Sequence, residues 1–432
     1  MTTMSSFNRI VALTYKKSFL QLLIVRNINS SLPISIPELD LDYICDPNNT
    51  NEIRDDIARR PNTNGGNIDK VIELNNLLKS NDCKQTRDNL IEEAIKLPNK
   101  TCPSVRNLTK PKILEEIGCK QNLAAAKSLE EAPPKVVIPS CRRLLRTERI
   151  GTITGPRTYY LTGALAKLEQ ALVNYSLKKL IEKGFSLISV PDLIHSSVVN
   201  ACGMNTEGER TQVYFLNPEI CLSGTAEMAL AAYFANQTQL MDHLPLKVAA
   251  VSRCYRSEVT KMAKERGLYR VRNFTKVEMF GVTADETNEE GDELLNDFVS
   301  IQKELFTELG LHFQVLEMPP QDLGAPTYKK IDIEAWMPGR KLFGEISSAS
   351  NCTTYQSRRF AIKYNNNNNE LKHCQTTNGT ACAVPRIIIA LTETHQKPDG
   401  SVVIPRPLIP YMGGLKEIKE EKLPKLNWVK NE

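Results

Sequence analysis

The sequence predicts an α/β (α+β) protein built on a large antiparallel β-sheet flanked by helices, with a small helical region before it. Strand-like segments are joined as hairpins rather than through crossover helices, and this favours antiparallel pairing. Segments with apolar residues at helical spacing lie between these hairpins. Neither GxGxxG nor GxxxxGK(S/T) occurs between a strand and a helix, which argues against a doubly wound nucleotide-binding sheet.

The composition is that of a soluble globular protein. The chain has 432 residues, 41% hydrophobic and 24% charged, enough for one large domain and a smaller one. The net charge of +5 permits nucleic-acid binding without requiring it. The 11 cysteines include no CxxC pair and no Cys/His cluster at zinc spacing, so we expect reduced thiols and no structural zinc.

Residues 1–35 are basic, contain apolar and serine residues, and include no Asp or Glu before Glu38. This pattern is typical of a mitochondrial transit peptide, and the alternative is an untargeted disordered tail. The apolar run at 19–25 is too short to span a bilayer, which takes roughly 20 residues. We therefore expect a protein of the mitochondrial matrix that does not bind membranes.

Residues 36–125 are expected to form a reduced helical region. Loop residues at 47–51 and 61–66 interrupt it, and two short helical patterns at 67–97 predict an antiparallel pair. The two apolar stripes are Val71, Leu74, Leu77 and Leu78, and Leu90, Ile91, Ala94 and Ile95. No sustained heptad repeat is present, so these residues cannot form a long coiled coil.

The main domain is expected over 126–414, and a solvated tail over 415–432. A helix at 168–181 is apolar on two sides and should be buried on both. An amphipathic helix is predicted at 289–310, with Gly310 as its stop. Its role is expected to be packing.

Two further segments belong to the predicted sheet. Tyr328 to Trp336 is expected to be one of its strands. The asparagine run at 365–369 interrupts another hairpin and predicts a disordered loop tip.

A long hairpin is predicted from strands at 247–258 and 268–282, joined by a charged loop. Because side chains alternate between the faces of a strand, five polar or aromatic side chains should share a face. They are Arg256, Glu258, Arg270, Phe274 and Glu278. Guanidinium groups suit phosphate and an aromatic ring suits a flat base, so the face predicts a nucleotide-binding cleft. The alternative is a solvated strand face.

Several ordered motifs resemble those of the class II aminoacyl-tRNA synthetases, in the form found in seryl-tRNA synthetases. CYRSE, RGLYRV and FTKVEMF of the hairpin resemble motif 2 of that family. The other matching segments are GTAE at 224–227, GEISSASNC at 344–352 and NGTACAVPR at 378–386. The likeness runs from about Gly155 to Met412 and is closest to mitochondrial members. It implies a class II catalytic domain, with the helix at 168–181 in the dimer interface.

The resemblance implies ATP-dependent activation of serine to seryl-adenylate and its transfer to mitochondrial tRNA(Ser), with ATP and Mg²⁺ as cofactors. The implied ATP-binding residues are Arg256, Glu258, Arg270, Phe274, Glu345 and Arg386. Arg256 and Arg386 would be catalytic, on the α-phosphate and the γ-phosphate. Pro385 favours a helix start, so Arg386 should lie near a helix N-terminus, where anions are favoured. Glu258 would meet the adenine amino group and Phe274 the adenine ring.

The resemblance also implies a serine pocket. Its residues would be Thr225, Glu227, Arg256, Glu278, Ser348 and Thr380. Glu278 and Thr380 would read the hydroxyl group, and the threonine and glutamate of GTAE the ammonium. Glu345 would hold Mg²⁺ with Ser348 beside it, as a hard cation prefers oxygen ligands. A homodimer is implied, or a heterodimer with a second synthetase subunit.

Some positions depart from the family. Arg272 and Asn273 stand where His and Gln are usual, Thr354 stands where Asp is usual, and the long tRNA-gripping coiled coil is missing. Arg272 is expected on the cleft face. These departures favour an alternative, a catalytically silent paralogue that acts as a binding or structural partner. A basic cluster that could meet tRNA comprises Lys110, Lys112, Arg142, Arg143, Arg146 and Arg149.

Overall fold

The computed structural model describes residues 37–420 except 62, 64, 120–126, 128–137, 142, 148–149, 207–210 and 259–266. The expected transit peptide at 1–35 lies outside the described residues, and so does most of the expected tail at 415–432.

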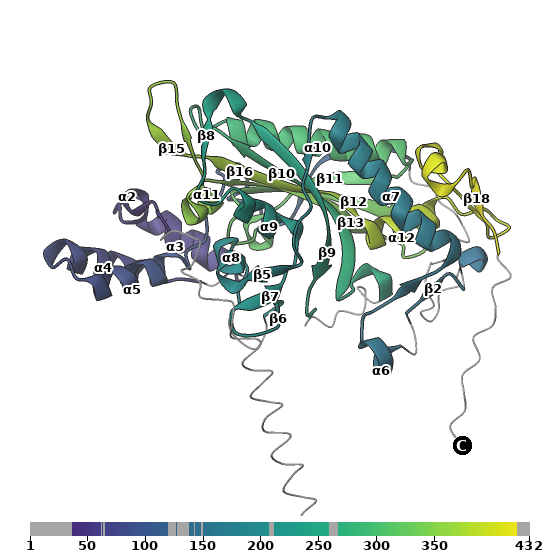
Figure 1. Ribbon diagram of the computed structural model, residues 1–432, viewed down its shortest axis with the longest axis horizontal. Helices are drawn as coiled ribbons and strands as arrows, with labels where there is room; N and C mark the ends of the chain where they lie inside the picture. The colour runs from purple at the N-terminus through teal and green to yellow at the C-terminus, as the bar shows by residue number, and fades with distance from the viewer. Residues whose placement is uncertain are drawn as a thin grey trace, which may run out of the picture.

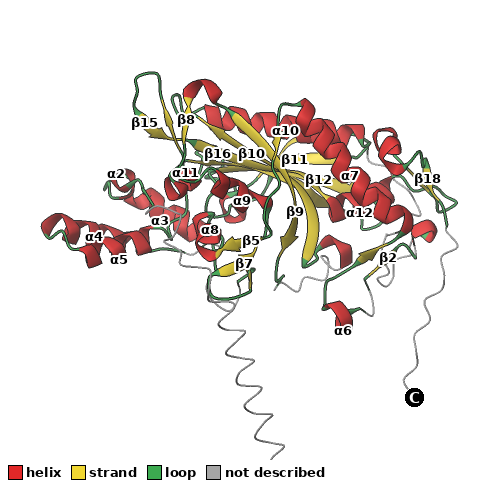
Figure 2. Cartoon of the chain, viewed as in Figure 1, coloured by secondary structure: helices red, strands yellow, loops and turns green. Residues whose placement is uncertain are grey.

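An eight-stranded sheet forms the centre of the molecule, in the order β1-β11-β12-β13-β16-β10-β9-β4 (Figures 1 and 2). The strands are β1 (Lys112–Ile117), β4 (Ser186–Leu187), β9 (Leu246–Tyr255), β10 (Asn273–Thr283), β11 (Phe313–Glu317), β12 (Lys329–Met337), β13 (Leu342–Thr353) and β16 (Gln375–Ala383). Every neighbouring pair is antiparallel except β4 with β9 at one edge. The predicted large antiparallel sheet is therefore confirmed, with one short parallel pair added.

Helices cover one face of this sheet. They are α7 (Gly163–Glu182), α10 (Glu290–Glu308) and α12 (Val384–Thr394). Val277 and Met279 of β10 join their side chains in the main core, whereas Phe280 and Val282 belong to a second cluster on the opposite face. Alternate residues of a strand face opposite sides of the sheet. The face that bears Phe280 and Val282 is the one that carries α9 (Ala226–Tyr233) and a polar cleft.

The predicted helices are confirmed. The apolar residues that predicted α10 (Leu294, Leu295, Phe298, Ile301, Leu305 and Phe306) are all buried. In α7, side chains from both predicted stripes are buried, including Leu172 of one and Leu180 of the other. A helix apolar on two sides is therefore packed on two sides, as expected.

Two expectations about irregular segments are wrong. β9 ends at Tyr255 and β10 begins at Asn273, so Arg256, Glu258 and Arg270 lie in the connecting segments. Glu258 has a φ of 51°, which an extended strand cannot accommodate. The asparagine run is an ordered turn, because the Asn366 side chain accepts hydrogen bonds from the backbone N–H groups of residues 368 and 370.

The N-terminal helices form a separate small cluster at one end of the molecule (Figure 1). They are α2 (Leu41–Ile44), α3 (Thr50–Arg59), α4 (Ile68–Ser80) and α5 (Lys84–Ala94). The predicted antiparallel pair is α4 and α5. Val71, Leu90 and Ala94 of its stripes are buried and the others are half-buried, except Leu77, which is 50% exposed. At about 1.5 Å per residue α4 is about 20 Å long, so the pair is a short projection.

The remaining elements are small. The α-helices are α6 (Gly151–Thr154), α8 (Ser196–Ala201) and α11 (Tyr355–Phe360). The 3-10 helices are η1 (Pro139–Cys141), η2 (Met241–His243), η4 (Gly267–Tyr269), η5 (Pro320–Asp322) and η6 (Arg406–Met412). The strands are β2 (Leu145–Arg146), β3 (Tyr160–Leu161), β5 (Leu193–His195), β6 (Tyr214–Phe215), β7 (Ile220–Leu222), β8 (Thr238–Leu240), β14 (Lys363–Asn365), β15 (Leu371–His373), β17 (Val402–Val403) and β18 (Glu417–Ile418). Within the described part of the chain, no helix combines the length and apolar character needed to cross a membrane.

Candidate functional site

The polar face of the sheet carries two adjoining clefts. The arginine cleft is lined by residues that include Arg256, Glu258, Tyr269, Arg270, Phe274, Lys276, Glu345, Ser347, Ser348, Thr380 and Arg386. The glutamate cleft is lined by residues that include Thr225, Glu227, Arg256, Lys276, Glu278, Lys330, Ser348, Asn378 and Thr380. All eleven predicted site residues therefore line one or both clefts. Arg256, Lys276, Ser348 and Thr380 line both, so the two clefts meet at these side chains.

Arg386 lies in the first turn of α12, directly after Pro385, as the sequence predicts. Its Nε donates to the backbone oxygen of Tyr269 at 3.2 Å, and its guanidinium carbon lies 4.6 Å from the centre of the Tyr269 ring. Its Nη1 lies 3.1 Å from the Glu345 carboxylate. These contacts hold the planar group rigidly at the wall of the arginine cleft.

A β-bulge brings Glu345 and Ser348 into the same cleft. Ser347 pairs with Ile333 of β12, but the next residue of β12, Glu334, pairs with Glu345, which leaves Ile346 as the extra residue. Without the bulge, residues three apart would point to opposite faces. Burial alone would raise the pKa of Glu345, but the Arg386 guanidinium and a nearby lysine ammonium hold it at about 2. The carboxylate is therefore ionised at neutral pH.

Glu258 is 6% exposed and lies between two arginines. Its carboxylate is 3.0 Å from Arg270 Nη1 and 3.7 Å from Arg157 Nη1, and Arg157 also donates to the Glu258 backbone oxygen at 2.8 Å. A buried carboxylate needs such partners because its desolvation is costly. The pairing fixes the carboxylate at the edge of the arginine cleft.

Arg256 stands where the two clefts meet. Its Nε donates to the backbone oxygen of Gly224 at 3.3 Å, and its guanidinium carbon lies 5.5 Å from the centre of the Phe274 ring. The arginine therefore contacts both an aromatic side chain of β10 and the segment before α9. Arg256, like Lys276, therefore faces both clefts.

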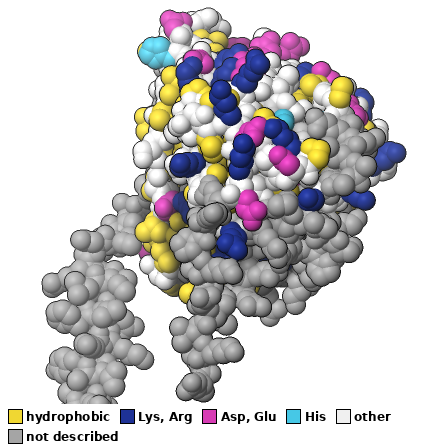
Figure 3. Space-filling view, turned by 90° about the vertical axis from the view of Figure 1, so that its right-hand side faces the viewer, with side chains coloured by type: hydrophobic (Ala, Val, Ile, Leu, Met, Phe, Trp, Pro, Cys, Tyr) yellow, Lys and Arg dark blue, Asp and Glu magenta, His cyan; other side chains and the backbone are white. Residues whose placement is uncertain are grey.

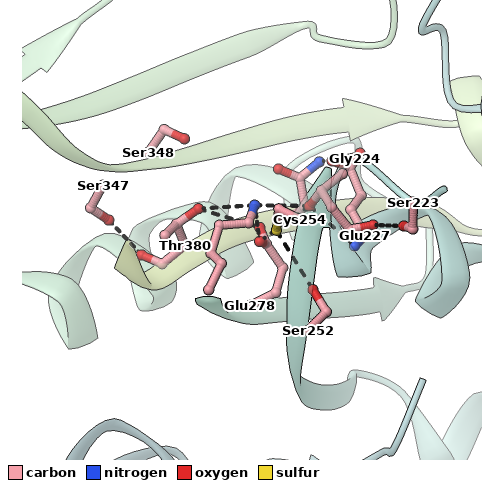
Figure 4. A network of polar contacts seen from close by, with 12 residues as sticks. Ser223, Gly224, Glu227, Ser252, Cys254, Glu278, Ser347, Ser348 and Thr380 are labelled. Carbon is pink, nitrogen blue, oxygen red and sulfur yellow. Dashed lines mark hydrogen bonds and ion pairs between the residues drawn. The ribbon is translucent and has the colours of Figure 1, made fainter. Parts of the chain in front are cut away.

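Glu278 and Thr380 face one another across neighbouring strands in the glutamate cleft (Figure 4). A second bulge, with Ala381 as the extra residue of β16, sets this pairing. Thr380 Oγ1 lies 3.5 Å from Glu278 Oε1, and both residues are almost fully buried. The Glu278 carboxylate also accepts from Thr225 Oγ1 at 3.3 Å.

Thr225 caps the N-terminus of α9, where its hydroxyl accepts from the backbone N–H of Glu227. This cap orients the Glu227 side chain, whose carboxylate accepts from the amides of Gln356 at 2.6 Å and Asn378 at 2.7 Å. Burial, together with the negative charge of Glu278, raises the pKa of Glu227 to about 7. This carboxyl group therefore changes its charge near neutral pH.

Three residues that line or support the site were not predicted from the sequence. Lys276 lies on the same face as Phe274 and Glu278, so the alternation that singled those out could have found it. Gln302 of α10 is fully buried and donates to the backbone oxygens of Ser348 at 2.9 Å and Thr380 at 3.0 Å. Helix α10 therefore does more than pack. No sequence signal pointed to Gln302 or to Arg157, because their partners are distant in the chain.

Two departures from the family pattern lie outside these clefts. Arg272 was expected on the cleft face, but it is not among the residues that line either cleft. Its backbone instead bonds to Arg157 and Arg256. Thr354 accepts from Arg358 and lies against the N-terminal helices. Neither departure therefore alters the residues that form the clefts.

Among the described residues, no group of three or more His, Cys, Asp or Glu side chains is arranged to hold a metal ion. Glu345 and Ser348 nevertheless supply a carboxylate and a hydroxyl to one cleft, and the carboxylate is ionised. Oxygen donors of this kind fit a magnesium ion that keeps several waters and is also bound by phosphates.

Comparison with known proteins places the chain in a family. Residues 215–395 match the model of the tRNA synthetase class II core domain (G, H, P, S and T). The mitochondrial serine–tRNA ligase of Mus musculus is 43% identical over 76% of this chain and 64% of its own length. The enzyme of the same name from Saccharomyces cerevisiae is 40% identical over 77% of this chain and 75% of its own length. This chain therefore spans less than two thirds of the mouse protein.

A solved structure agrees with the sequence relatives. The seryl-tRNA synthetase of Pyrococcus horikoshii, crystallised with ATP, superimposes with a TM-score of 0.78 at 27% identity, over 89% of this chain and 100% of that chain. The class II synthetase fold expected from the motifs is confirmed. With the sheet, the clefts and these relatives taken together, the chain belongs to the seryl-tRNA synthetase family.

Proposed function

We propose that the protein activates serine with ATP to form seryl-adenylate and transfers the seryl group to a mitochondrial tRNA(Ser). The observation that carries this proposal is the junction of the two clefts at Arg256. The arginine cleft offers arginines and an aromatic ring, which suit a nucleoside triphosphate. The other is lined by carboxylate and hydroxyl groups, of which Thr225, Glu278 and Thr380 are buried, and such groups suit a small polar amino acid.

In the proposed reaction, an oxygen of the serine carboxylate attacks the α-phosphorus and pyrophosphate leaves. No protein nucleophile is needed, so catalysis consists of positioning and charge neutralisation. Arg256 would bind the α-phosphate and the serine carboxylate, and Arg386 the γ-phosphate. Phe274 would stack on adenine, Glu258 would accept from its amino group, and Arg270 would hold Glu258 in place.

The remaining roles concern serine and the metal ion. Glu278 and Thr380 would bind the serine hydroxyl, and Thr225 and Glu227 the ammonium group. Glu345, with the Ser348 hydroxyl, would hold Mg²⁺. When bound, the ion would neutralise charge on the phosphates.

The partners and compartment follow from the same proposal. The mitochondrial relatives support a mitochondrial location, and we place the protein in the matrix, with residues 1–35 as the transit peptide. We propose 36–125 as the reduced helical region, except that β1 joins the sheet of the catalytic domain, with 126–414 as the rest of that domain and 415–432 as a solvated tail. A dimer, either homodimer or heterodimer with a second synthetase subunit, is supported by exposed apolar side chains near β4. Ile181, Leu187 and Leu193 are each more than 50% exposed.

Recognition of tRNA would have to differ from that of a family member with a long arm. The α4–α5 pair is short, and basic and acidic side chains are intermixed on the face at the β2 and β18 end of the molecule (Figure 3). Lys110, Lys112 and Arg143 of the proposed basic cluster are exposed, whereas Arg142 and Arg149 lie outside the described residues. If this cluster meets phosphates, neutralising Arg143 and Arg146 should flatten the salt dependence of tRNA affinity.

Serine-dependent exchange of radiolabelled pyrophosphate into ATP tests the main proposal. The expected result is exchange with serine and none without an amino acid. The second candidate function, a silent paralogue that binds a partner, is favoured by the short α4–α5 pair. A folded protein that binds tRNA or a second synthetase subunit but gives no exchange would establish that function and overturn the first.

A further inference from the structure

Lys276 is a buried cation at the junction of the two clefts. It is 7% exposed and lines both clefts. Its ammonium contacts the carboxylate of Glu278, lies 2.8 Å from Thr225 Oγ1 and 3.5 Å from Thr380 Oγ1. The three groups that it contacts are therefore all proposed serine-binding groups.

Because of Lys276, the two carboxylates of the glutamate cleft, Glu278 and Glu227, have contacts of different charge. Glu278 is paired with an ammonium group, whereas the contacts of Glu227 are the neutral amides of Gln356 and Asn378. A ligand ammonium near Glu278 would meet the positive charge of Lys276 at close range, and like charges in a buried site repel strongly. An ammonium near Glu227 would meet a carboxylate whose contacts among the described residues include no cation.

Two of the three described cations that line the glutamate cleft lie at one side of it, and the third, Lys330, is paired with Asp332 at 2.8 Å. Arg256 and Lys276 both line the junction with the arginine cleft. A ligand carboxylate is attracted to that junction, which is also where it would meet the α-phosphate. The charges therefore define a direction across the glutamate cleft, from Glu227 to the two cations.

We propose that Lys276 is a specificity-determining residue that fixes the orientation of the amino acid in the glutamate cleft. The ligand ammonium is directed to Glu227, its carboxylate to Lys276 and Arg256, and its hydroxyl to Glu278 and Thr380. This inference rests on the proposed function.

Lys276 also prepares Glu278 to recognise a hydroxyl group. The ammonium and Thr225 both engage Oε2 of Glu278, while Oε1 faces Thr380. A carboxylate pinned in this way accepts a hydrogen bond at Oε1 from a ligand hydroxyl. Alanine has no hydroxyl group and would leave Glu278 Oε1 with only its 3.5 Å contact to Thr380, and a site built to hydrogen-bond a hydroxyl penalises that loss.

The test compares Lys276→Met with Lys276→Arg and the wild type in pyrophosphate exchange. Methionine keeps the length of the side chain but removes its charge, whereas arginine keeps the charge. For Lys276→Met we expect the KM for serine to rise by at least about tenfold. The preference for serine over alanine should fall by a similar factor, because the Glu278 carboxylate that accepts a hydrogen bond from the serine hydroxyl is no longer held in place. The KM for ATP should change by less than about twofold, because the phosphates are bound by other side chains. Lys276→Arg should recover part of the preference.

The matched control is Lys372→Met. This change removes a lysine of β15 from its exposed ion pair with Glu286 and should leave both KM values unchanged. Binding is measured separately, as the shift of the melting temperature produced by serine. If Lys276→Met fails to fold, Lys276→Gln replaces it.

The outcomes separate the two proposals. A Lys276→Met protein that binds serine and rejects alanine as well as the wild type does would overturn the role of Lys276 and leave the proposed function intact. A wild-type protein that binds serine without activating it would overturn the proposed function, while the binding comparison would still test Lys276. A wild-type protein that neither binds nor activates serine would overturn both.

Discussion

The guanidinium of Arg386 lies 3.1 Å from the carboxylate of Glu345, although the two residues are 41 positions apart in the chain. The same Nη1 also donates to the Glu345 backbone oxygen at 3.1 Å. The first turn of α12 is therefore bound to the bulged part of β13. A phosphate-binding arginine and a metal-binding carboxylate would be held in register by this contact.

Replacing Arg386 by alanine tests its proposed contact with the γ-phosphate. We expect pyrophosphate exchange to slow by roughly a hundredfold, which corresponds to about 3 kcal/mol of lost transition-state stabilisation. Arg386→Lys should recover little of the rate because lysine lacks the planar fork. Arg253→Ala is the control, since Arg253 is 44% exposed and pairs with Glu169 rather than with a cleft residue. An unchanged rate for Arg386→Ala would refute the assignment.

The KM for serine is expected to depend on pH because of Glu227. Its pKa is raised to about 7 by burial and by the charge of Glu278, so the carboxyl group is protonated below pH 7 and ionised above it. Only the ionised form attracts an ammonium group. The KM for serine should therefore fall as the pH rises through 7, and should increase about tenfold for each pH unit below it.

The dependence of the KM for serine on pH between 5.5 and 8.5 checks this expectation. Glu227→Gln should bind serine weakly at every pH in that range, because the amide does not titrate. A wild-type KM that stays flat through pH 7 would show that Glu227 does not bind the ammonium group.

Glu258 is expected to select adenine. A carboxylate accepts from the 6-amino group of adenine but only repels the 6-oxygen of guanine, whereas an amide can donate to that oxygen. Glu258→Gln should therefore raise the KM for ATP about tenfold and allow some use of GTP. Parallel exchange assays with the two nucleotides measure this. Strict use of ATP by the variant would place adenine elsewhere in the arginine cleft.

The sequence predicted the sheet, the long helices and the set of cleft residues, because periodicity and motif order are local. The sequence did not predict the strand ends and bulges that direct these side chains into the cleft. Arg256 and Arg270 were expected on strands but lie in the connecting segments, and Thr380 faces Glu278 only because Ala381 forms a bulge. A bulge changes which residues share a face without changing the local pattern. Gln302 was missed for a similar reason, because its partners are backbone atoms of distant strands.

The N-terminal helices are joined to the glutamate cleft through Arg60. This residue is 1% exposed and donates to the backbone oxygens of Gly324 at 3.2 Å and Thr327 at 2.9 Å, and to Thr101 Oγ1 at 2.7 Å. Burial lowers the pKa of Arg60 to about 10, so it remains charged at neutral pH. Gly324 and Thr327 line the glutamate cleft, so Arg60 supports one of its walls.

Arg60→Met should therefore destabilise the protein and weaken serine binding together. The variant loses the three hydrogen bonds that Arg60 donates and leaves the Thr327 backbone oxygen without that donor, whereas the Gly324 oxygen keeps its bond from the Thr327 N–H. This loss should cost about 2 kcal/mol of unfolding free energy. The midpoint of urea unfolding and the KM for serine measure the two effects. Arg54→Met is the matched control, because Arg54 is 52% exposed in its pair with Asp69 and such pairs contribute at most about 1 kcal/mol. If both variants unfold at the same urea concentration and bind serine equally, the N-terminal helices do not support the cleft.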